Sequence, residues 1–101
     1  MNDPAGSGAS AGAIVRVLEI INKKGLHARA SAKFVQTVET FDASITVSKD
    51  GMTVGGNSIM GLMMLAASPG SSVLVSASGN QAEQALDALD QLIQNKFGED
   101  M

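Results

Sequence analysis

The chain has no cysteine, no tryptophan and no tyrosine, and it has only one histidine and three phenylalanines among its 101 residues. Without cysteine it cannot form a disulfide scaffold or a cysteine-ligated metal centre, and with His27 alone it cannot form a multi-histidine metal site. The scarcity of aromatic side chains argues against a nucleic-acid surface based on stacking, and the net charge of −3 argues against a general polyanion binder. We therefore expect no metal, no cofactor and no nucleic-acid partner.

Long apolar segments are also missing. No apolar run reaches the roughly 18 residues that a membrane-spanning helix needs, and the N-terminal stretch MNDPAGSGASAG lacks the basic and apolar regions of a signal peptide. We expect a cytoplasmic protein without membrane association. Because residues 1–12 offer little apolar surface, they are predicted to be a flexible tail. Residues 13–101 are predicted to form a single domain.

The spacing of apolar residues predicts seven elements in the order βαββαβα. Alternating or β-branched runs predict strands over 14–21, 44–48, 52–54 and 72–78. Helical spacing predicts helices over 28–40, 59–67 and 81–95. Each strand has one clearly apolar face; in the first strand Ile14, Leu18 and Ile20 form the apolar set. This pattern favours an α+β fold with one mostly antiparallel four-stranded sheet, three helices on one face and water on the other.

Several turn and capping residues support these boundaries. Asp50-Gly51 is typical of a type I′ hairpin turn. Ser58 is a plausible N-cap for the second helix. Asn80, with Glu83 three positions later, resembles the start of a capped third helix.

Basic residues gather at the start of the first predicted helix. Lys23, Lys24, His27, Arg29 and Lys33 lie within eleven positions that contain no acidic residue. A helix N-terminus leaves backbone N–H groups without partners and carries partial positive charge, so it is suited to phosphate or carboxylate. The arginine can add charge-assisted hydrogen bonds to phosphate oxygens. The pattern therefore predicts an anion site.

His27 stands where the loop becomes the helix, and a neutral imidazole can accept a covalent group and release it. The combination suits a histidine that is phosphorylated. From composition alone, two other interpretations stay open: a lone histidine beside a loop is more commonly an exposed or capping residue, and a basic cluster is more commonly solvated surface. A hydrolase with His27 as general base is disfavoured, because no neighbouring Asp or Glu orients the ring and no nucleophile is marked.

The segment that begins at Ser58 admits two interpretations as well. Ser58 is either only a helix cap or also a regulatory phosphorylation site, where a phosphate would add negative charge at a helix start. Leu62 and Leu65 are expected to face the sheet. The remaining apolar residues of this helix are either core or a surface that accepts partners, a role for which methionine is suited. We call Ile59, Met60 and Met63 the docking surface.

Three segments of the chain resemble HPr, the histidine-containing phosphocarrier family of the phosphoenolpyruvate-dependent phosphotransferase system. They are GLHARA (25–30), NSIMGLMMLAAS (57–68) and VSASGNQAEQAL (75–86). The resemblance implies an open-faced β-sandwich. It implies that His27 accepts phosphate on Nδ1 from phosphorylated enzyme I and passes it to an enzyme IIA, that Arg29 helps to hold the phosphate, and that the protein is a carrier rather than an enzyme. We expect a monomer.

The same resemblance assigns roles around the second helix. It implies that Ser58 is the serine modified by HPr kinase/phosphorylase in some lineages, and that the docking surface is exposed and contacts partners. An alternative function follows: a regulatory binding module whose partner is chosen by the phosphorylation states of His27 and Ser58. The chain has Ala30 where the family usually has proline, and alanine should preserve the helix. The NKKG, FDA and NKFGED segments are more similar to the nitrogen-regulatory branch than to the sugar branch.

Overall fold

The computed structural model describes residues 13–99, so the tail predicted over residues 1–12 lies outside the described residues. The elements follow the predicted order. They are β1 (Ile14–Glu19), α1 (Ala28–Val38), β2 (Ser44–Lys49), β3 (Met52–Gly55), α2 (Ile59–Met64), β4 (Ser72–Ser78) and α3 (Ala82–Gln94), followed by a short turn, η1 (Lys96–Gly98). No helix in residues 13–99 is long and apolar enough to cross a membrane.

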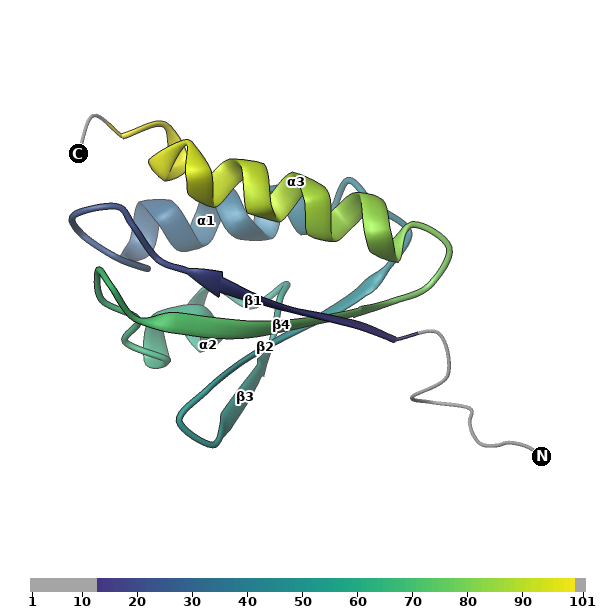
Figure 1. Cartoon of the computed structure of the whole chain (residues 1–101), viewed down its shortest axis with the longest axis horizontal. Coiled ribbons are helices and arrows are strands. Elements are labelled where there is room, and N and C mark those ends of the chain that lie inside the picture. The colour runs from purple at the N-terminus through teal and green to yellow at the C-terminus, as the bar shows by residue number, and fades with distance from the viewer. Residues whose placement is uncertain (1–12, 100–101) are drawn as a thin grey trace.

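The four strands form one sheet in the order β1-β4-β2-β3, and every pairing is antiparallel. In this register Val75 of β4 lies between Arg16 of β1 and Val47 of β2. Figure 1 shows α1 and α3 running side by side over the sheet. The predicted α+β open-faced sandwich is confirmed, with a sheet that is wholly rather than mostly antiparallel.

The hairpin between β2 and β3 turns where the sequence predicts it. Asp50 and Gly51 both have positive φ angles, 53° and 83°. A type I′ turn needs positive φ at both central residues, and its twist matches that of the flanking strands. The predicted turn type is therefore confirmed.

The core lies between the sheet and the helices. Alternate residues of β4, Val73, Val75 and Ala77, are buried against the helices, as predicted. The prediction for β1 is wrong in part, because Ile14 is exposed and the strand ends at Glu19. Ile14 stands at the first position of the strand, where fewer side chains cover it, and Ile20 is fully buried just beyond the strand.

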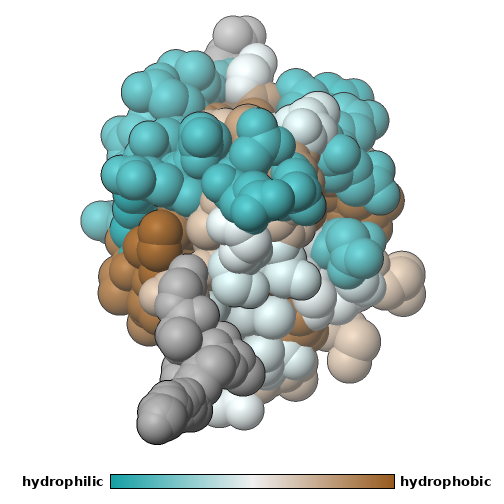
Figure 2. Space-filling model, turned by 90° about the vertical axis from the view of Figure 1, so that its right-hand side faces the viewer, coloured by the Kyte–Doolittle hydropathy of each residue, from teal (hydrophilic) through white to brown (hydrophobic). Residues whose placement is uncertain are grey.

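The opposite face of the sheet is open. By the alternation of side chains along a strand, Val15, Val17 and Leu74 point to this face, and all three are exposed. Figure 2 shows hydrophilic residues gathered over the helix layer at the top of the molecule, with hydrophobic residues reaching the surface lower down. The predicted arrangement, a sheet covered by helices on one side only, accounts for the exposed apolar side chains of the open face and for the hydrophilic surface over the helices.

The start of α3 differs from the prediction that Asn80 caps it. The side-chain amide of Asn80 donates a hydrogen bond to Asp42 Oδ2 (3.0 Å), and the helix begins at Ala82 with Gln81 at the capping position. Gln81 Oε1 accepts a hydrogen bond from the backbone N–H of Asp42 (2.8 Å). Asn80 and Gln81 are thus engaged in tertiary contacts with the loop before β2, which is why neither side chain caps the helix.

Candidate functional site

His27 is the N-cap of α1, as its position in the sequence predicts. Its backbone is extended, with φ −75° and ψ −177°, and its Nδ1 accepts a hydrogen bond from the backbone N–H of Arg29 (3.3 Å). The carbonyl oxygen of His27 accepts the first helical hydrogen bond, from the N–H of Ser31 (2.8 Å). The ring is therefore aimed at the amide groups that begin the helix, where an anion is favoured.

The loop before His27 holds this position through a close approach of two backbones. Leu26 N donates a hydrogen bond to Ala67 O (3.0 Å). Gly25, beside it, has a φ of +65°, and a Cβ there would lie 2.2 Å from the same carbonyl oxygen. Only glycine meets both constraints. The glycine of the GLHARA segment thus sets the path of the chain into the site.

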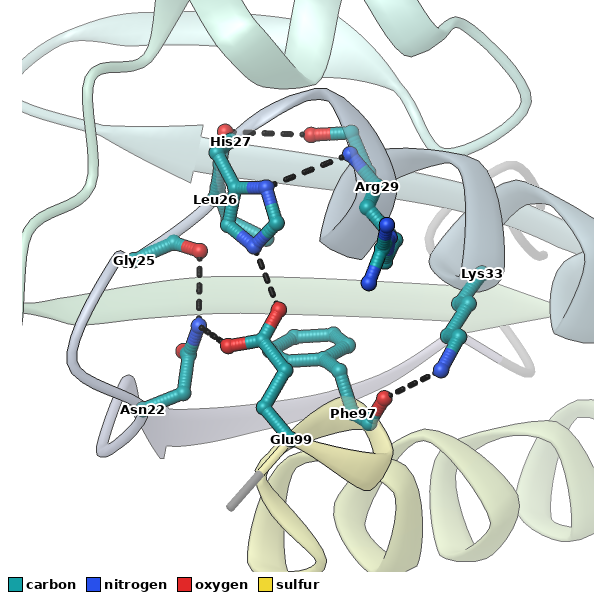
Figure 3. Close-up of polar contacts among 9 residues, drawn as sticks. Asn22, Gly25, Leu26, His27, Arg29, Lys33, Phe97 and Glu99 are labelled. Atoms are coloured by element: carbon teal, nitrogen blue, oxygen red, sulfur yellow. Dashed lines mark hydrogen bonds and ion pairs between the residues drawn. The ribbon is translucent and has the colours of Figure 1, made fainter. Parts of the chain in front are cut away.

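A carboxylate that the sequence did not point to completes the site. Glu99 Oε2 contacts Nε2 of His27, although the two residues are 72 positions apart. Figure 3 shows the carboxylate of Glu99 directed at the ring, on the side away from the start of α1. The sequence has no neighbouring Asp or Glu to orient the ring, but folding brings a carboxylate to it from beyond α3.

Glu99 is itself held in place. Asn22 is fully buried, and its Nδ2 donates hydrogen bonds to Glu99 Oε1 (3.0 Å) and to Gly25 O (2.9 Å). Burial raises the pKa of Glu99, but hydrogen bonds from Asn22 and His27 and the charges of His27 and Lys24 outweigh it and lower that pKa. The carboxyl group is therefore held in its ionised form.

The turn η1 brings Glu99 to this place. Lys96, Phe97 and Gly98 all have left-handed φ angles, 55°, 56° and 78°, so the chain reverses sharply after α3. Phe97 is fully buried, and its carbonyl oxygen accepts a hydrogen bond from Lys33 Nζ of α1 (2.6 Å). This turn was not predicted from the sequence, in which an apolar residue followed by glycine just after a helix is the only local signal.

The basic residues predicted to form an anion site do come together. An open cavity of about 530 Å³ is lined by His27 and Glu99, by Ala28 and Gly98, and by the basic residues Lys23, Lys24, Arg29 and Lys33. Within residues 13–99 the guanidinium of Arg29 makes no hydrogen bond or ion pair with another side chain. It is therefore available to an anion in the cavity. The described residues contain no group of three or more potential metal ligands.

The second helix matches the exposed rather than the core interpretation. Leu62 and Leu65 are buried, as predicted. The docking surface is exposed, with Met60 at 69%. Met64, at 63%, is equally accessible and was not singled out from the sequence. Ser58 Oγ accepts a hydrogen bond from the N–H of Gly61 (3.0 Å), so Ser58 is the cap of α2.

With Ala30 in place of proline, α1 still begins at Ala28, and Ala30 is fully buried in its first turn. The helix start thus does not depend on proline, as the sequence predicts.

Comparison with known proteins identifies the family. Residues 14–95 match the family model described as the PTS HPr component phosphorylation site. The chain belongs to the HPr family. HPr proteins are phosphocarriers of the phosphotransferase system, so the resemblance seen in the sequence is confirmed.

Individual relatives are similar in sequence to this chain over most of its length. The phosphocarrier protein HPr of Cupriavidus necator is 51% identical over 80 residues, which are 79% of this chain and 90% of that protein. The HPr of Neisseria meningitidis serogroup A is 50% identical over 82 residues, 81% of this chain and 92% of its own. Assignment to the nitrogen-regulatory branch stays a prediction.

Solved structures show the same fold. The crystal structure of HPr-C-His from Thermoanaerobacter tengcongensis is similar with a TM-score of 0.83 at 48% identity, covering 87% of this chain and 99% of that one. The Bacillus subtilis protein Crh is similar with a TM-score of 0.66 at 40% identity over 78% of this chain and 91% of its own, and it is described as a dimer with a swapped domain. Relatives can thus dimerise, and the expected monomer stays a prediction.

Proposed function

We propose that His27 accepts a phosphoryl group on Nδ1 from phosphorylated enzyme I and passes it to an enzyme IIA. The observation that carries this proposal is the hydrogen bond from the Arg29 amide to Nδ1 inside a cavity lined by four basic side chains. A phosphoryl group on Nδ1 would meet amide N–H groups at the start of α1, where unpaired donors and the helix dipole favour negative charge.

Arg29 has a specific part in this proposal. Its guanidinium is exposed at the cavity, and a planar guanidinium can bind two phosphate oxygens at once. It would stabilise the phosphoryl group on His27 and would also contact the phosphoryl oxygens while the group is transferred. We further propose that the protein acts as a monomer in the cytoplasm.

The docking surface supports transient contact with both partners. Ile59, Met60 and Met63 expose apolar side chains from a short helix, and methionine adapts to differently shaped surfaces. A relay protein needs such a surface, because it must bind a donor and an acceptor in turn and release both.

The proposal is tested with labelled phosphoenolpyruvate and enzyme I. We expect one acid-labile phosphoryl group on the wild type and none on His27→Ala. Arg29→Lys is the companion variant, because it keeps the charge but loses the two-point contact; it should be labelled more slowly. Circular dichroism confirms that the variants fold. If His27→Ala still takes up the label, the carrier assignment is wrong.

Ser58 supports a second, regulatory function. Its hydroxyl caps α2 immediately before the docking surface, so a phosphate on it would place negative charge beside the apolar residues that partners contact. We propose that modification by an HPr kinase/phosphorylase would change which protein is bound. Affinities of Ser58→Asp and Ser58→Ala for enzyme I test this without any enzyme II. Equal affinities of the two variants would count against the regulatory function.

A further inference from the structure

Every methionine of residues 13–99 is exposed, and three of them lie together on α2. Met63 and Met64 follow Met60 by three and four positions, which makes them neighbours of Met60 on the surface of a helix. Methionine is usually a buried residue, but the least accessible of the three, Met63, is still 39% exposed. We call Met60, Met63 and Met64 the methionine cluster. It overlaps the docking surface and extends it by one residue.

The thioether of an accessible methionine reacts with peroxides. The sulfur lone pair attacks one oxygen of hydrogen peroxide, the O–O bond breaks, and the second oxygen leaves as water. The sulfur is oxidised by two electrons to a sulfoxide, and the peroxide is reduced. A methionine sulfoxide reductase reverses the change: two thiols supply two electrons and become a disulfide, and the sulfoxide oxygen leaves as water. The apolar side chain is thus converted to a polar one and back.

We propose that the methionine cluster is a reversible oxidation site, at which conversion to sulfoxides by peroxide weakens the binding of protein partners. This inference rests on the proposed function, because it takes enzyme I as a partner of the docking surface. In the free protein, water solvates the sulfoxide oxygens. In a complex the same oxygens would be buried against apolar contacts without a hydrogen-bond donor, which is unfavourable.

The cluster is separate from the core that holds α2 in place. Leu62 and Leu65 supply the buried side of this segment, and the buried core of residues 13–99 contains no methionine. Oxidised methionine disrupts a protein mainly where the side chain is packed in a core or an interface. Oxidation of the cluster should therefore leave the fold intact. The chain has no cysteine, so peroxide cannot act on it through thiols.

The cluster is also separate from the phosphorylation site. None of its three methionines lines the cavity around His27. Oxidation should therefore weaken the docking of enzyme I without changing the chemistry at His27. In labelling by phosphorylated enzyme I, loss of binding alone raises KM and leaves kcat unchanged. This separation distinguishes the oxidation site from general damage to the protein.

The main variant replaces the cluster with leucine, as Met60→Leu, Met63→Leu and Met64→Leu in one chain. Leucine has a similar volume and is apolar, but it cannot be oxidised. This triple variant keeps the three methionines outside α2, so it reports any effect of oxidation elsewhere. The matched control is Met52→Leu on β3, which removes an exposed methionine but keeps the cluster. Met60→Gln adds a polar amide to the cluster without any oxidant.

Each full chain is treated with hydrogen peroxide, which is then removed, and peptide mass spectrometry locates the sulfoxides. Circular dichroism reports the fold, and calorimetry reports the affinity for enzyme I. We expect oxidised wild type and oxidised Met52→Leu to bind about tenfold or more weakly, with KM raised and kcat unchanged. Sulfoxide reductase should restore binding. The triple variant should bind equally well before and after peroxide, and untreated Met60→Gln should bind more weakly than untreated wild type.

Four results would overturn the inference: a cluster that stays reduced while Met52 is oxidised, an oxidised wild type that binds as tightly as the untreated one, an oxidised wild type that has lost its fold, or an oxidised triple variant that loses as much affinity as the wild type. If the triple variant does not fold, wild-type affinity of Met60→Gln would overturn it instead. An untreated wild type that neither binds enzyme I nor takes up label overturns the proposed function, so the two failures are distinguishable.

Discussion

Lys33 Nζ of α1 donates a 2.6 Å hydrogen bond to the carbonyl oxygen of Phe97, two residues before the carboxylate that contacts His27. This bond joins the helix that begins at the site to the turn that follows α3 (Figure 3). A left-handed backbone costs roughly 1–2 kcal/mol for each ordinary residue, and both Lys96 and Phe97 adopt it. Burial of a phenylalanine side chain contributes roughly 1.5–3 kcal/mol, and a hydrogen bond from a charged group contributes roughly 1.5–3 kcal/mol more. The turn therefore depends on both the burial of Phe97 and the bond from Lys33.

Phe97→Ala should destabilise the protein more than its place near the end of the chain would suggest. Phe97 is fully buried, and truncation of a buried phenylalanine costs roughly 3–5 kcal/mol through lost burial and the cavity left behind. The free energy of unfolding in urea measures the effect. Phe41→Ala is the control, because Phe41 is only partly buried and its truncation should cost less. An equal loss in the two variants would show that Phe97 does not anchor the turn.

Gly25→Ala should be costly in stability and should move His27. A Cβ at position 25 would lie 2.2 Å from Ala67 O, so the two loops must separate. Gly70→Ala is the matched control, because Gly70 also has positive φ, +88°, but has open space around its Cβ position. The control should lose only the roughly 1–2 kcal/mol of the left-handed backbone, and Gly25→Ala more. The amide NMR shift of Arg29 should change only in Gly25→Ala; a shift in neither variant contradicts the prediction.

Local sequence predicts the elements of this fold well and its long-range polar contacts poorly. The alternation of Val73, Val75 and Ala77 identifies β4 and its buried face, because strand geometry repeats every two residues. The same holds for His27, whose place before α1 follows from the change of periodicity behind it. Each of these predictions depends only on the identities of a few residues that are neighbours in the sequence.

The contacts of Glu99 and Asn80 could not be predicted from neighbouring residues in this way. Nothing around Glu99 indicates a partner 72 positions away; that contact depends on the reversal at Phe97 and on the packing of α3 against α1. Asn80 has the sequence of a helix cap, but its amide is bound to Asp42 from another loop. In both cases a tertiary contact decides the role of the polar side chain. The neighbouring residues suggest no role for Glu99 and a different role for Asn80.

The contact between Glu99 and His27 should contribute to stability in a pH-dependent way. The pKa of Glu99 is lowered in the folded protein relative to its ordinary value of 4.5. A carboxyl group with a depressed folded pKa contributes stability that is present above the unfolded pKa and is lost as the pH falls through the folded one. The difference in unfolding free energy between the wild type and Glu99→Gln should therefore shrink as the pH is lowered from 7 to below about 4.5.

Urea unfolding at a series of pH values measures this difference. Glu83→Gln serves as the control, because Glu83 is exposed on α3, and its curve should run parallel to that of the wild type. If the plot of unfolding free energy against pH for Glu99→Gln also stays parallel to that of the wild type, the contacts of the carboxylate with Asn22 and His27 do not contribute to stability.

Met60→Glu should weaken the binding of enzyme I without changing stability. Met60 is 69% exposed on the docking surface, so a charge there is solvated in the free protein, and such surface changes usually shift stability by less than about 0.5 kcal/mol. In a complex the same charge would be buried against apolar contacts, and a loss of affinity of about tenfold or more is expected. Met52→Glu, at an exposed methionine of β3 outside the docking surface, is the control. Calorimetry should find wild-type affinity for Met52→Glu and weaker binding for Met60→Glu; equal affinities would place the enzyme I contact elsewhere on the molecule.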